Sequence, residues 1–379
     1  MKKKKSNGSL IVSIGTAVPD NRYRQQAIAD FMIRFFGTDD ESSRKLSVIY
    51  NRSGIEFRHS VLPDFFADGK KPRLFIDPQQ NPVLTNRLQI YGEEAIRLAA
   101  KAATYCLQQL RVTDAKRLLP VTHLITVSCT GMSAPGLDLQ LMQELSLPGT
   151  VHRTSVNFMG CYAAFHALKI ADAICRSDEA AMVMIVMVEL CSLHFQPEMD
   201  SQNMVVNSLF ADGAAAMLIT SGRKCRQLTV PALRLNSFYS RVIHEGAEMM
   251  TWKPAEMGFL MRLDSMVPQL IEEHSNHLMK EAMLSFGSKR SKVTHWAIHP
   301  GGRKILEAVQ RGMQLSNHNL KESYAVLRSF GNMSSPSIAF VLKMIMQEKL
   351  QWKKKEKIFA AGFGPGLTIE TAMLQPVIT

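Results

Sequence analysis

The chain has 379 residues, of which 46% are apolar, and a formal net charge of +12. This length allows two domains of common size or one large duplicated fold with a sizeable core. No apolar run is long enough to span a bilayer and no basic stripe interleaves with aromatic residues, so neither stable membrane insertion nor nucleic-acid binding is expected. The six cysteines show no Cys-x-x-Cys spacing, which argues against a disulfide framework or a metal site and favours a reducing, cytoplasmic location.

The chain begins with lysines and a short apolar run, which together imitate a signal peptide. Ser13 and Gly15 interrupt the apolar run, and a turn at Pro19 follows it. We therefore expect a buried first strand at residues 10–18 in place of a signal peptide. Much of the remaining net charge lies in lysine-rich loops, which are most simply solvated.

Helical and strand periodicities alternate along the rest of the chain. Helices are expected at about residues 25–36, 89–109, 161–174, 265–285, 304–313 and 336–347. Strands are expected at about residues 123–130, 180–188, 214–219, 294–298 and 357–361. The run at 180–188 is apolar throughout, as in a strand that is covered on both faces. Strands that alternate with helices, twice over, predict an α/β fold of two similar halves that meet near residues 221–230.

One cysteine stands where a reactive thiol is expected. Gly160 allows a tight turn after a strand, and Cys161 then falls in the first turn of a helix. Unpaired N–H groups and the helix dipole favour a thiolate at this position. Taken alone, the stretch fits a small buried hydrophobic residue better, because most free cysteines are of that kind.

Other polar or flexible motifs follow predicted strands or precede predicted helices, where loops converge and sites are usually built. His299 ends a strand and is followed by Gly301 and Gly302. Asn332 precedes a helix, and Phe210 precedes an Ala-Asp-Gly sequence. Each motif alone is a weak signal, since a single histidine is more often a hydrogen-bonded structural residue.

Together and in this order, the motifs closely resemble those of the type III polyketide synthases, the chalcone and stilbene synthase family. They are Gly160-Cys161, Leu209-Phe210-Ala211-Asp212-Gly213, His299-Pro300-Gly301-Gly302, Gly331-Asn332-Met333-Ser334-Ser335 and Gly362-Phe363-Gly364-Pro365-Gly366. The resemblance covers nearly the whole chain and implies a thiolase-like, five-layered α-β-α-β-α fold with mixed sheets. Its amino-terminal half, residues 1–223, would carry the nucleophile, and residues 224–379 would carry the histidine and asparagine.

The resemblance also implies the roles of individual residues. Cys161 is the expected nucleophile, His299 and Asn332 form a polar pair, and Phe210 is a gatekeeper between the active site and a coenzyme A tunnel. An acyl-CoA starter would be loaded on Cys161 and extended with malonyl-CoA, by a homodimer that needs no metal or redox cofactor. An imidazolium at His299 would lower the pKa of the thiol, and the side-chain N–H donors of the polar pair would stabilise the enolate formed by decarboxylation.

The same comparison suggests residues that contact substrates. Cavity and substrate contacts are expected at Cys129, Thr130, Cys191, His194, Trp252, Phe259, Met261, Gly301, Gly302 and Ser334. Candidates for the coenzyme A phosphates are Arg52, Arg58 and Lys304. Ala134 stands where the family often has a methionine in the loop that crosses the dimer, so the partner's contribution to the cavity is expected to differ.

Two large side chains bear on the product. His194 stands where the family commonly has threonine, and Trp252 where plant members tend to have glycine. A smaller cavity predicts few extensions, two or three malonyl units. The segment Glu189-Leu190-Cys191-Ser192-Leu193 resembles that of bacterial members that accept fatty acyl starters, which implies an aliphatic starter and alkylpyrones or alkylresorcinols as products. The alternatives are a naphthalene-forming or phloroglucinol-forming enzyme that uses malonyl-CoA alone, a single-condensation 3-oxoacyl synthase of the synthase III type, and a catalytically idle relative.

Overall fold

A computed structural model of the chain describes residues 8–66, 71–110, 121–198, 200–222, 230–352 and 356–378. The lysine-rich start and most of the expected break at 221–230 lie outside these ranges. Within them, none of the helices is both long enough and apolar enough to cross a membrane.

The centre of the fold is a nine-stranded mixed sheet with the strand order β11-β12-β13-β8-β1-β7-β6-β4-β5. Its strands are β1 (Leu10–Ala17), β4 (His123–Ser128), β5 (His152–Asn157), β6 (Met182–Leu190), β7 (Asp212–Thr220), β8 (Pro231–Val242), β11 (His295–Ile298), β12 (Ile358–Gly364) and β13 (Thr368–Ile378). Two small antiparallel sheets pair β2 (Asn21–Arg24) with β3 (Phe57–Ser60), and β9 (Met250–Ala255) with β10 (Gly258–Leu263).

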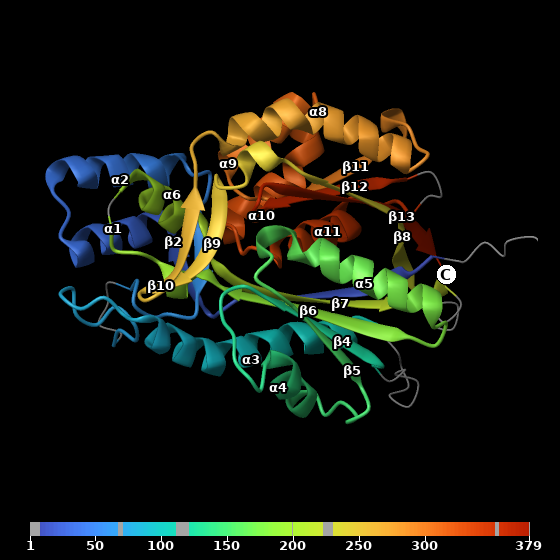
Figure 1. Ribbon diagram of the computed structural model, residues 1–379, viewed down its shortest axis with the longest axis horizontal. Coiled ribbons are helices and arrows are strands. Elements are labelled where there is room, and N and C mark those ends of the chain that lie inside the picture. The colour runs from blue at the N-terminus through green and yellow to red at the C-terminus, as the bar shows by residue number, and fades with distance from the viewer. Residues whose placement is uncertain are drawn as a thin grey trace, which may run out of the picture.

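The strand order repeats within the large sheet. In the first part β4 is parallel to β6, while β6 with β7 and β7 with β1 are antiparallel. In the second part β11 is parallel to β12, while β12 with β13 and β13 with β8 are antiparallel. The two parts meet where Leu10 and Ile11 of β1 pair with Arg234 and Leu233 of β8. Because this junction is so short, the parts diverge and form two layers (Figure 1).

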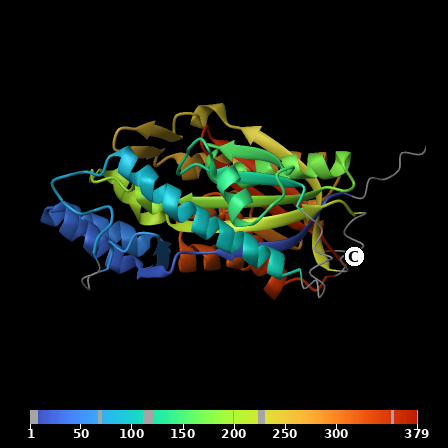
Figure 2. The ribbon, with the colours of Figure 1, turned by 90° about the horizontal axis from the view of Figure 1, so that it is seen from below.

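Helices complete the layers. The sheet parts are covered by α3 (Leu84–Gln108), α4 (Leu137–Glu144), α8 (Val267–Ser285) and α9 (Arg303–Gly312), and α5 (Ala163–Ser177) and α11 (Ser337–Glu348) lie between them. Seen from below, α3 crosses the outer face of the first part (Figure 2). The remaining helices are α1 (Gln25–Phe36), α2 (Asp40–Arg52), α6 (Ser201–Leu209) and α10 (Lys321–Phe330). This is the expected thiolase-like fold in five layers.

The expected elements are present, with informative differences. The helix at 25–36 agrees with α1, whereas the apolar strand at 180–188 is shifted and continues through Glu189 as β6. Helix α2 was missed because only Leu46 and Tyr50 of its side chains are buried, so its apolar periodicity is weak. The hairpin of β9 and β10 was missed because most of its side chains are not buried.

The packing of α3 on β1 depends on Gly15. A Cβ atom at this position would lie 2.2 Å from the carbonyl oxygen of Ala102 and 2.3 Å from the amide nitrogen of Cys106. We expect Gly15→Ala to lower the free energy of unfolding by about 2 kcal/mol, because backbone cannot yield as a side chain can. Urea denaturation measures the change. Gly92→Ala is the control, since nothing lies within 4 Å of its Cβ position in the exposed face of α3, and it should stabilise by about 0.5–1 kcal/mol.

Candidate active site

Cys161 lies in a short 3-10 turn, η2 (Gly160–Tyr162), between β5 and α5. Gly160 has a φ of 75°, and a Cβ atom there would lie 2.6 Å from Cδ of Pro365. Glycine is therefore required twice, for the backbone conformation and for the close packing of the 362–366 loop. Burial raises the pKa of the Cys161 thiol to about 11.

A backbone bridge brings the two halves together beside Cys161. The N–H of Ala211 donates to the carbonyl of Asn332, and the N–H of Asn332 donates to the carbonyl of Leu209, both at 2.9 Å. This pairing fixes Phe210 next to Asn332, although they are far apart in the sequence. The gatekeeper position and the polar pair are thus set by one piece of backbone geometry.

The amide of Asn332 is oriented by its neighbours. Its Oδ1 accepts from the N–H of Ser334 at 2.8 Å, and its Nδ2 donates to the carbonyl of Gly301 at 3.1 Å. Nδ2 also lies 4.0 Å from Sγ of Cys161. The N–H group of the Asn332 amide therefore faces the sulfur of Cys161. It can donate a hydrogen bond to the carbonyl oxygen of a thioester bound there.

His299 follows the end of β11 and is 1% exposed. Neither of its ring nitrogens has a hydrogen-bond partner within the described ranges, and burial lowers the pKa of His299 to about 3. The expected imidazolium is therefore wrong for the free enzyme, because burial favours a neutral ring and a protonated thiol. A neutral imidazole still offers one donor and one acceptor, and buried polar groups without partners are rare outside functional sites.

A cavity lies in front of Cys161. It is lined by Cys129, Thr130, Gly160, Cys161, Cys191, His194, Phe195, Val206, Phe210, Trp252, Met261, Ser334 and Pro365. The space that the centres of water molecules can occupy is about 30 Å³, which holds one or two waters. Val206 was not predicted, since no motif marks it and only the folded chain brings it to the cavity.

Two aromatic residues narrow this cavity. The N–H of Phe259 donates to Nδ1 of His194 at 3.1 Å, so Nε2 carries the proton and donates to the carbonyl of Thr130 at 2.8 Å. The His194 ring stacks on Phe259, which lies behind it, at 4.4 Å and 11°. Nε1 of Trp252 donates to the carbonyl of Cys129 at 2.7 Å. Both rings are held in place, and burial lowers the pKa of His194 to about 3.

A carboxylate lies behind the same wall. Glu189, which is 0% exposed, accepts from the N–H of Cys129 and the hydroxyls of Thr130 and Ser335, each at 2.9 Å. These donors explain how an acidic side chain is buried here, and β6 continues past the predicted end because Glu189 and Leu190 pair with Gly213 and Asp212 of β7. Burial raises the pKa of Glu189 to about 7. An acidic residue directly after nine apolar residues was the available sequence signal for this site.

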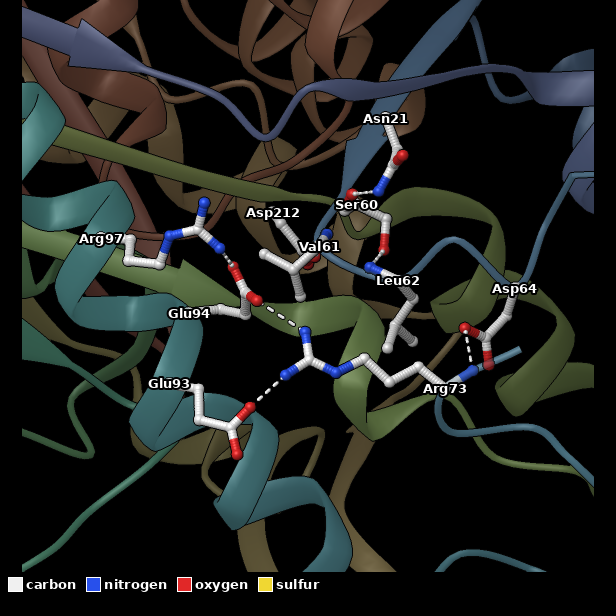
Figure 3. Close-up of polar contacts among 10 residues, drawn as sticks. All are labelled: Asn21, Ser60, Val61, Leu62, Asp64, Arg73, Glu93, Glu94, Arg97 and Asp212. Carbon is white, nitrogen blue, oxygen red and sulfur yellow. Dashed lines mark hydrogen bonds and ion pairs between the residues drawn. The ribbon is translucent and has the colours of Figure 1, made fainter. Parts of the chain in front are cut away.

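A second buried carboxylate supports the cavity-lining turn η3 (Cys191–His194). Asp212 accepts from the N–H of Val61 at 2.8 Å (Figure 3), and from the N–H and hydroxyl of Ser192 at 2.8 and 2.6 Å. It therefore joins the strand after Phe210 to the turn that carries His194. Burial raises the pKa of Asp212 to about 6. In the part of the chain that the structure covers, no cluster of His, Cys, Asp and Glu could hold a metal ion.

The three basic candidates differ in position. Arg58 is 1% exposed and donates to the carbonyls of Asn207 at 2.6 Å and Phe210 at 2.7 Å, so a phosphate contact there is wrong. Arg52 ends α2 and Lys304 lies in the first turn of α9, and both are exposed. These helix ends are adjacent, because Cβ of Arg303 lies 3.3 Å from the Cβ position of Gly54.

Two glycines that were expected to contact substrates lie outside the cavity lining. Gly302 precedes α9 and Gly301 contacts Asn332, and neither lines the cavity.

Family comparisons agree with this architecture. The family model of chalcone and stilbene synthases, N-terminal domain, matches residues 1–223, and that of the C-terminal domain matches residues 234–378. A solved structure of PKS-I from the brown alga Ectocarpus siliculosus superposes with a TM-score of 0.91 at 26% identity, covering 99% of this chain and 100% of that one. The type III polyketide synthase domain of Steely1 from Dictyostelium superposes with a TM-score of 0.86 at 26% identity, covering 98% of this chain and 100% of that one.

The fold is thus that of a thiolase-like condensing enzyme, and the chain belongs to the chalcone and stilbene synthase family. It is a type III polyketide synthase, an acyltransferase that uses coenzyme A thioesters. A 3,5-dihydroxyphenylacetyl-CoA synthase from Streptomyces toyocaensis is 30% identical over 368 residues, 96% of this chain and 89% of that protein. The alpha-pyrone synthesis polyketide synthase-like Pks18 of Mycobacterium tuberculosis is 28% identical over 362 residues, which are 96% of this chain and 90% of that protein.

The neutral ring of His194 predicts a specific loss of stability in acid. Its pKa is about 3 in the fold and about 6.5 in an unfolded chain, so between these values the unfolded state binds one more proton. Stability is retained above pH 6.5 and falls as the pH drops below it. His194→Gln keeps one donor and one acceptor but cannot titrate, and should reduce the slope of unfolding free energy between pH 4 and 6 by about 1.4 kcal/mol per pH unit.

Urea denaturation at several pH values measures this slope. His318→Gln, at an exposed position, is the control and should leave the slope unchanged. Equal slopes for the parent and His194→Gln would show that His194 is not held neutral by the fold.

Proposed function

We propose that an acyl-CoA starter is transferred to Cys161 and extended with malonyl-CoA by decarboxylative condensation. The observation that carries this proposal is the backbone bridge that sets Asn332 beside Phe210, with Nδ2 of Asn332 4.0 Å from Sγ of Cys161. Asn332 also binds Gly301, two residues after His299, whose buried ring has no hydrogen-bond partner in the described part of the chain. In the loading step the Cys161 thiolate attacks the thioester carbonyl and the coenzyme A thiolate leaves. The free acceptor nitrogen of His299 takes the thiol proton, which finally protonates the released coenzyme A.

Extension requires a carbanion from malonyl-CoA. Its terminal C–C bond breaks, carbon dioxide leaves, and the electron pair forms an enolate on the thioester oxygen. Asn332 Nδ2 and an N–H of His299 stabilise this oxygen, with donors of this kind worth about 3 kcal/mol each. The enolate carbon then attacks the acyl carbon, and the sulfur of Cys161 leaves. The Phe210 ring makes the surroundings of the malonyl carboxylate apolar, which favours loss of neutral carbon dioxide.

Substrate binding is proposed to need no separate cofactor and no metal. Arg52 and Lys304 remain the candidates for the coenzyme A phosphates, because their helix ends are exposed and adjacent. A cytoplasmic location is proposed because the thiols of Cys106, Cys129, Cys161 and Cys191 are free, as a nucleophilic cysteine requires.

A homodimer is proposed from the free side of β5. This edge strand pairs only with β4 in the described sheet, and the side chains of His152–Ser155 are exposed. Met132 and Leu139, which flank the loop that contains Ala134, are 50% and 42% exposed. A second copy could extend the sheet and cover these apolar side chains. The halves are proposed to divide at residue 223.

The product is proposed to be an alkylpyrone or alkylresorcinol made with two or three malonyl units. The support is the small cavity, in which His194 and Trp252 are both held as walls. The name of the mycobacterial relative, which refers to alpha-pyrone synthesis, agrees with this class. Naphthalene-forming or phloroglucinol-forming chemistry, from malonyl-CoA alone, and a single condensation are the alternatives.

One incubation distinguishes these possibilities. Purified protein is mixed with malonyl-CoA and a panel of acyl-CoA starters, and the products are identified by mass. Pyrones or resorcinols that contain an aliphatic starter support the proposal. Products from malonyl-CoA alone, a single extension, or no release of coenzyme A would each select a different alternative.

Substitutions at the polar site should separate its two reactions. Cys161→Ala should abolish chain extension but retain decarboxylation of malonyl-CoA, because the donors remain. Asn332→Ala should slow decarboxylation itself by about 10²–10³-fold. Release of labelled carbon dioxide and formation of polyketide are measured in parallel. Polyketide made by Cys161→Ala at the parent rate would refute the assignment of the nucleophile.

Enlarging the cavity should lengthen the product. His194→Thr combined with Trp252→Gly removes both aromatic walls, and the surrounding packed interior cannot yield that space otherwise. The combined variant should add at least one malonyl unit, measured by product mass with a fixed starter. A parent enzyme that already makes pentaketides from malonyl-CoA, unchanged by both substitutions, would contradict the prediction.

A further inference from the structure

The backbone around His194 is held in an unusual way. Three consecutive carbonyls, those of Leu193, His194 and Phe195, each accept a hydrogen bond from a buried side chain. Arg87 donates to the carbonyl of Leu193 and, at 3.1 Å, to that of Phe195. Nε2 of Gln196 donates to the carbonyl of His194 at 2.9 Å. The main chain on both sides of the cavity wall is therefore fixed by side chains.

Stability alone does not explain an arginine at position 87. The residue lies within α3 and is 0% exposed, and all its acceptors are carbonyls, including that of Pro82 at 3.0 Å. Its Nη2 has no hydrogen-bond partner in the described part of the chain, and burial lowers the pKa of Arg87 to about 10. The group remains charged near neutral pH. A buried cation without a hydrogen-bonded carboxylate is unfavourable, and an apolar side chain there would avoid the desolvation.

The shape of the guanidinium explains the choice. Nη1 donates to the carbonyls on both sides of His194, and Nε donates to the carbonyl of Pro82. The rigid guanidinium plane fixes these two nitrogens relative to each other, which a single ammonium group on a flexible stem cannot do. Gly258 of β10 permits this contact, because its φ is 127° and a Cβ atom there would lie 3.0 Å from Nε of Arg87 and 3.2 Å from Nε2 of Gln196. Helix α3, turn η3 and hairpin β9–β10 thus meet at one guanidinium.

The consequence concerns the cavity. The His194 ring is held by Thr130 and Phe259, and its main chain is held by Arg87 and Gln196. A growing acyl chain can displace the ring by breaking these two ring hydrogen bonds or by moving the main chain, and Arg87 and Gln196 oppose the second route. We propose that Arg87 and Gln196 are positioning residues that limit the number of extensions by preventing the His194 segment from yielding to the growing chain. The inference rests on the proposed function and identifies what sets its product length.

The test uses the full chain with one acyl-CoA starter and malonyl-CoA. Arg87→Lys keeps the charge but loses the rigid plane that holds Nη1 through the bond of Nε to Pro82, and Gln196→Met removes the other donor at similar volume. Each should shift the main product by one malonyl unit toward that of His194→Thr. The same changes in a His194→Thr background should add nothing further. The KM for the starter should change less than twofold, because the loading site is not touched.

Arg97→Lys is the matched control. Arg97 lies on the same helix, its side chain is 76% exposed, and it pairs with Glu94 at 3.4 Å (Figure 3). This variant should give the parent product pattern. Melting temperatures of all variants show whether they fold.

Several results would overturn the inference. A folded Arg87→Lys or Gln196→Met variant with the parent product pattern would do so, as would a shift of equal size in the His194→Thr background. If Arg87→Lys does not fold, Gln196→Met decides. If neither folds, the residues have a structural role only. Failure of the proposed function is distinguishable, because the parent enzyme itself would then release no coenzyme A with any starter.

Discussion

The site depends on one pair of backbone hydrogen bonds, those between residues 209–211 and Asn332. They join a segment of the first half to a segment of the second, and so place Phe210, Asn332 and Cys161 around one point. Arg58 strengthens this junction from inside by binding the carbonyl of Phe210. Neither half could form the site alone, because the nucleophile lies in the first half and its expected polar partners lie in the second.

Sequence patterns predicted the elements whose apolar periodicity is strong and the residues that stand at element ends. Gly160 with Cys161 and Gly331 with Asn332 were recognisable because glycine marks the turns that present them. Arg58 was misjudged because its burial follows from distant contacts at Asn207 and Phe210, which local sequence does not reveal. The ionisation of His299 was misjudged for the same reason, since burial by the whole fold determines its neutral state.

The cavity wall illustrates a further limit. A comparison of residue sizes at His194 and Trp252 predicted a narrow cavity, and the structure has both rings lining it. It could not predict that hydrogen bonds from Thr130, Phe259 and Cys129 fix the rings, or that Arg87 reaches the wall from α3. Side-chain volume is readable from a sequence, whereas resistance of a wall to displacement comes from contacts between distant segments.

The repeated strand order has an electrostatic consequence. In the first half Cys161 directly precedes α5, and in the second half Asn332 lies shortly before α11, so the two central helices both begin near the cavity. The amino end of each helix carries about half a positive elementary charge. Both ends favour negative charge on the cavity side of their helices, and none of the described residues that line the cavity is a lysine or an arginine. The duplicated fold therefore provides a positive potential for short-lived anions, while the nearby permanent cations, Arg58 and Arg87, lie behind the wall and bind backbone carbonyls.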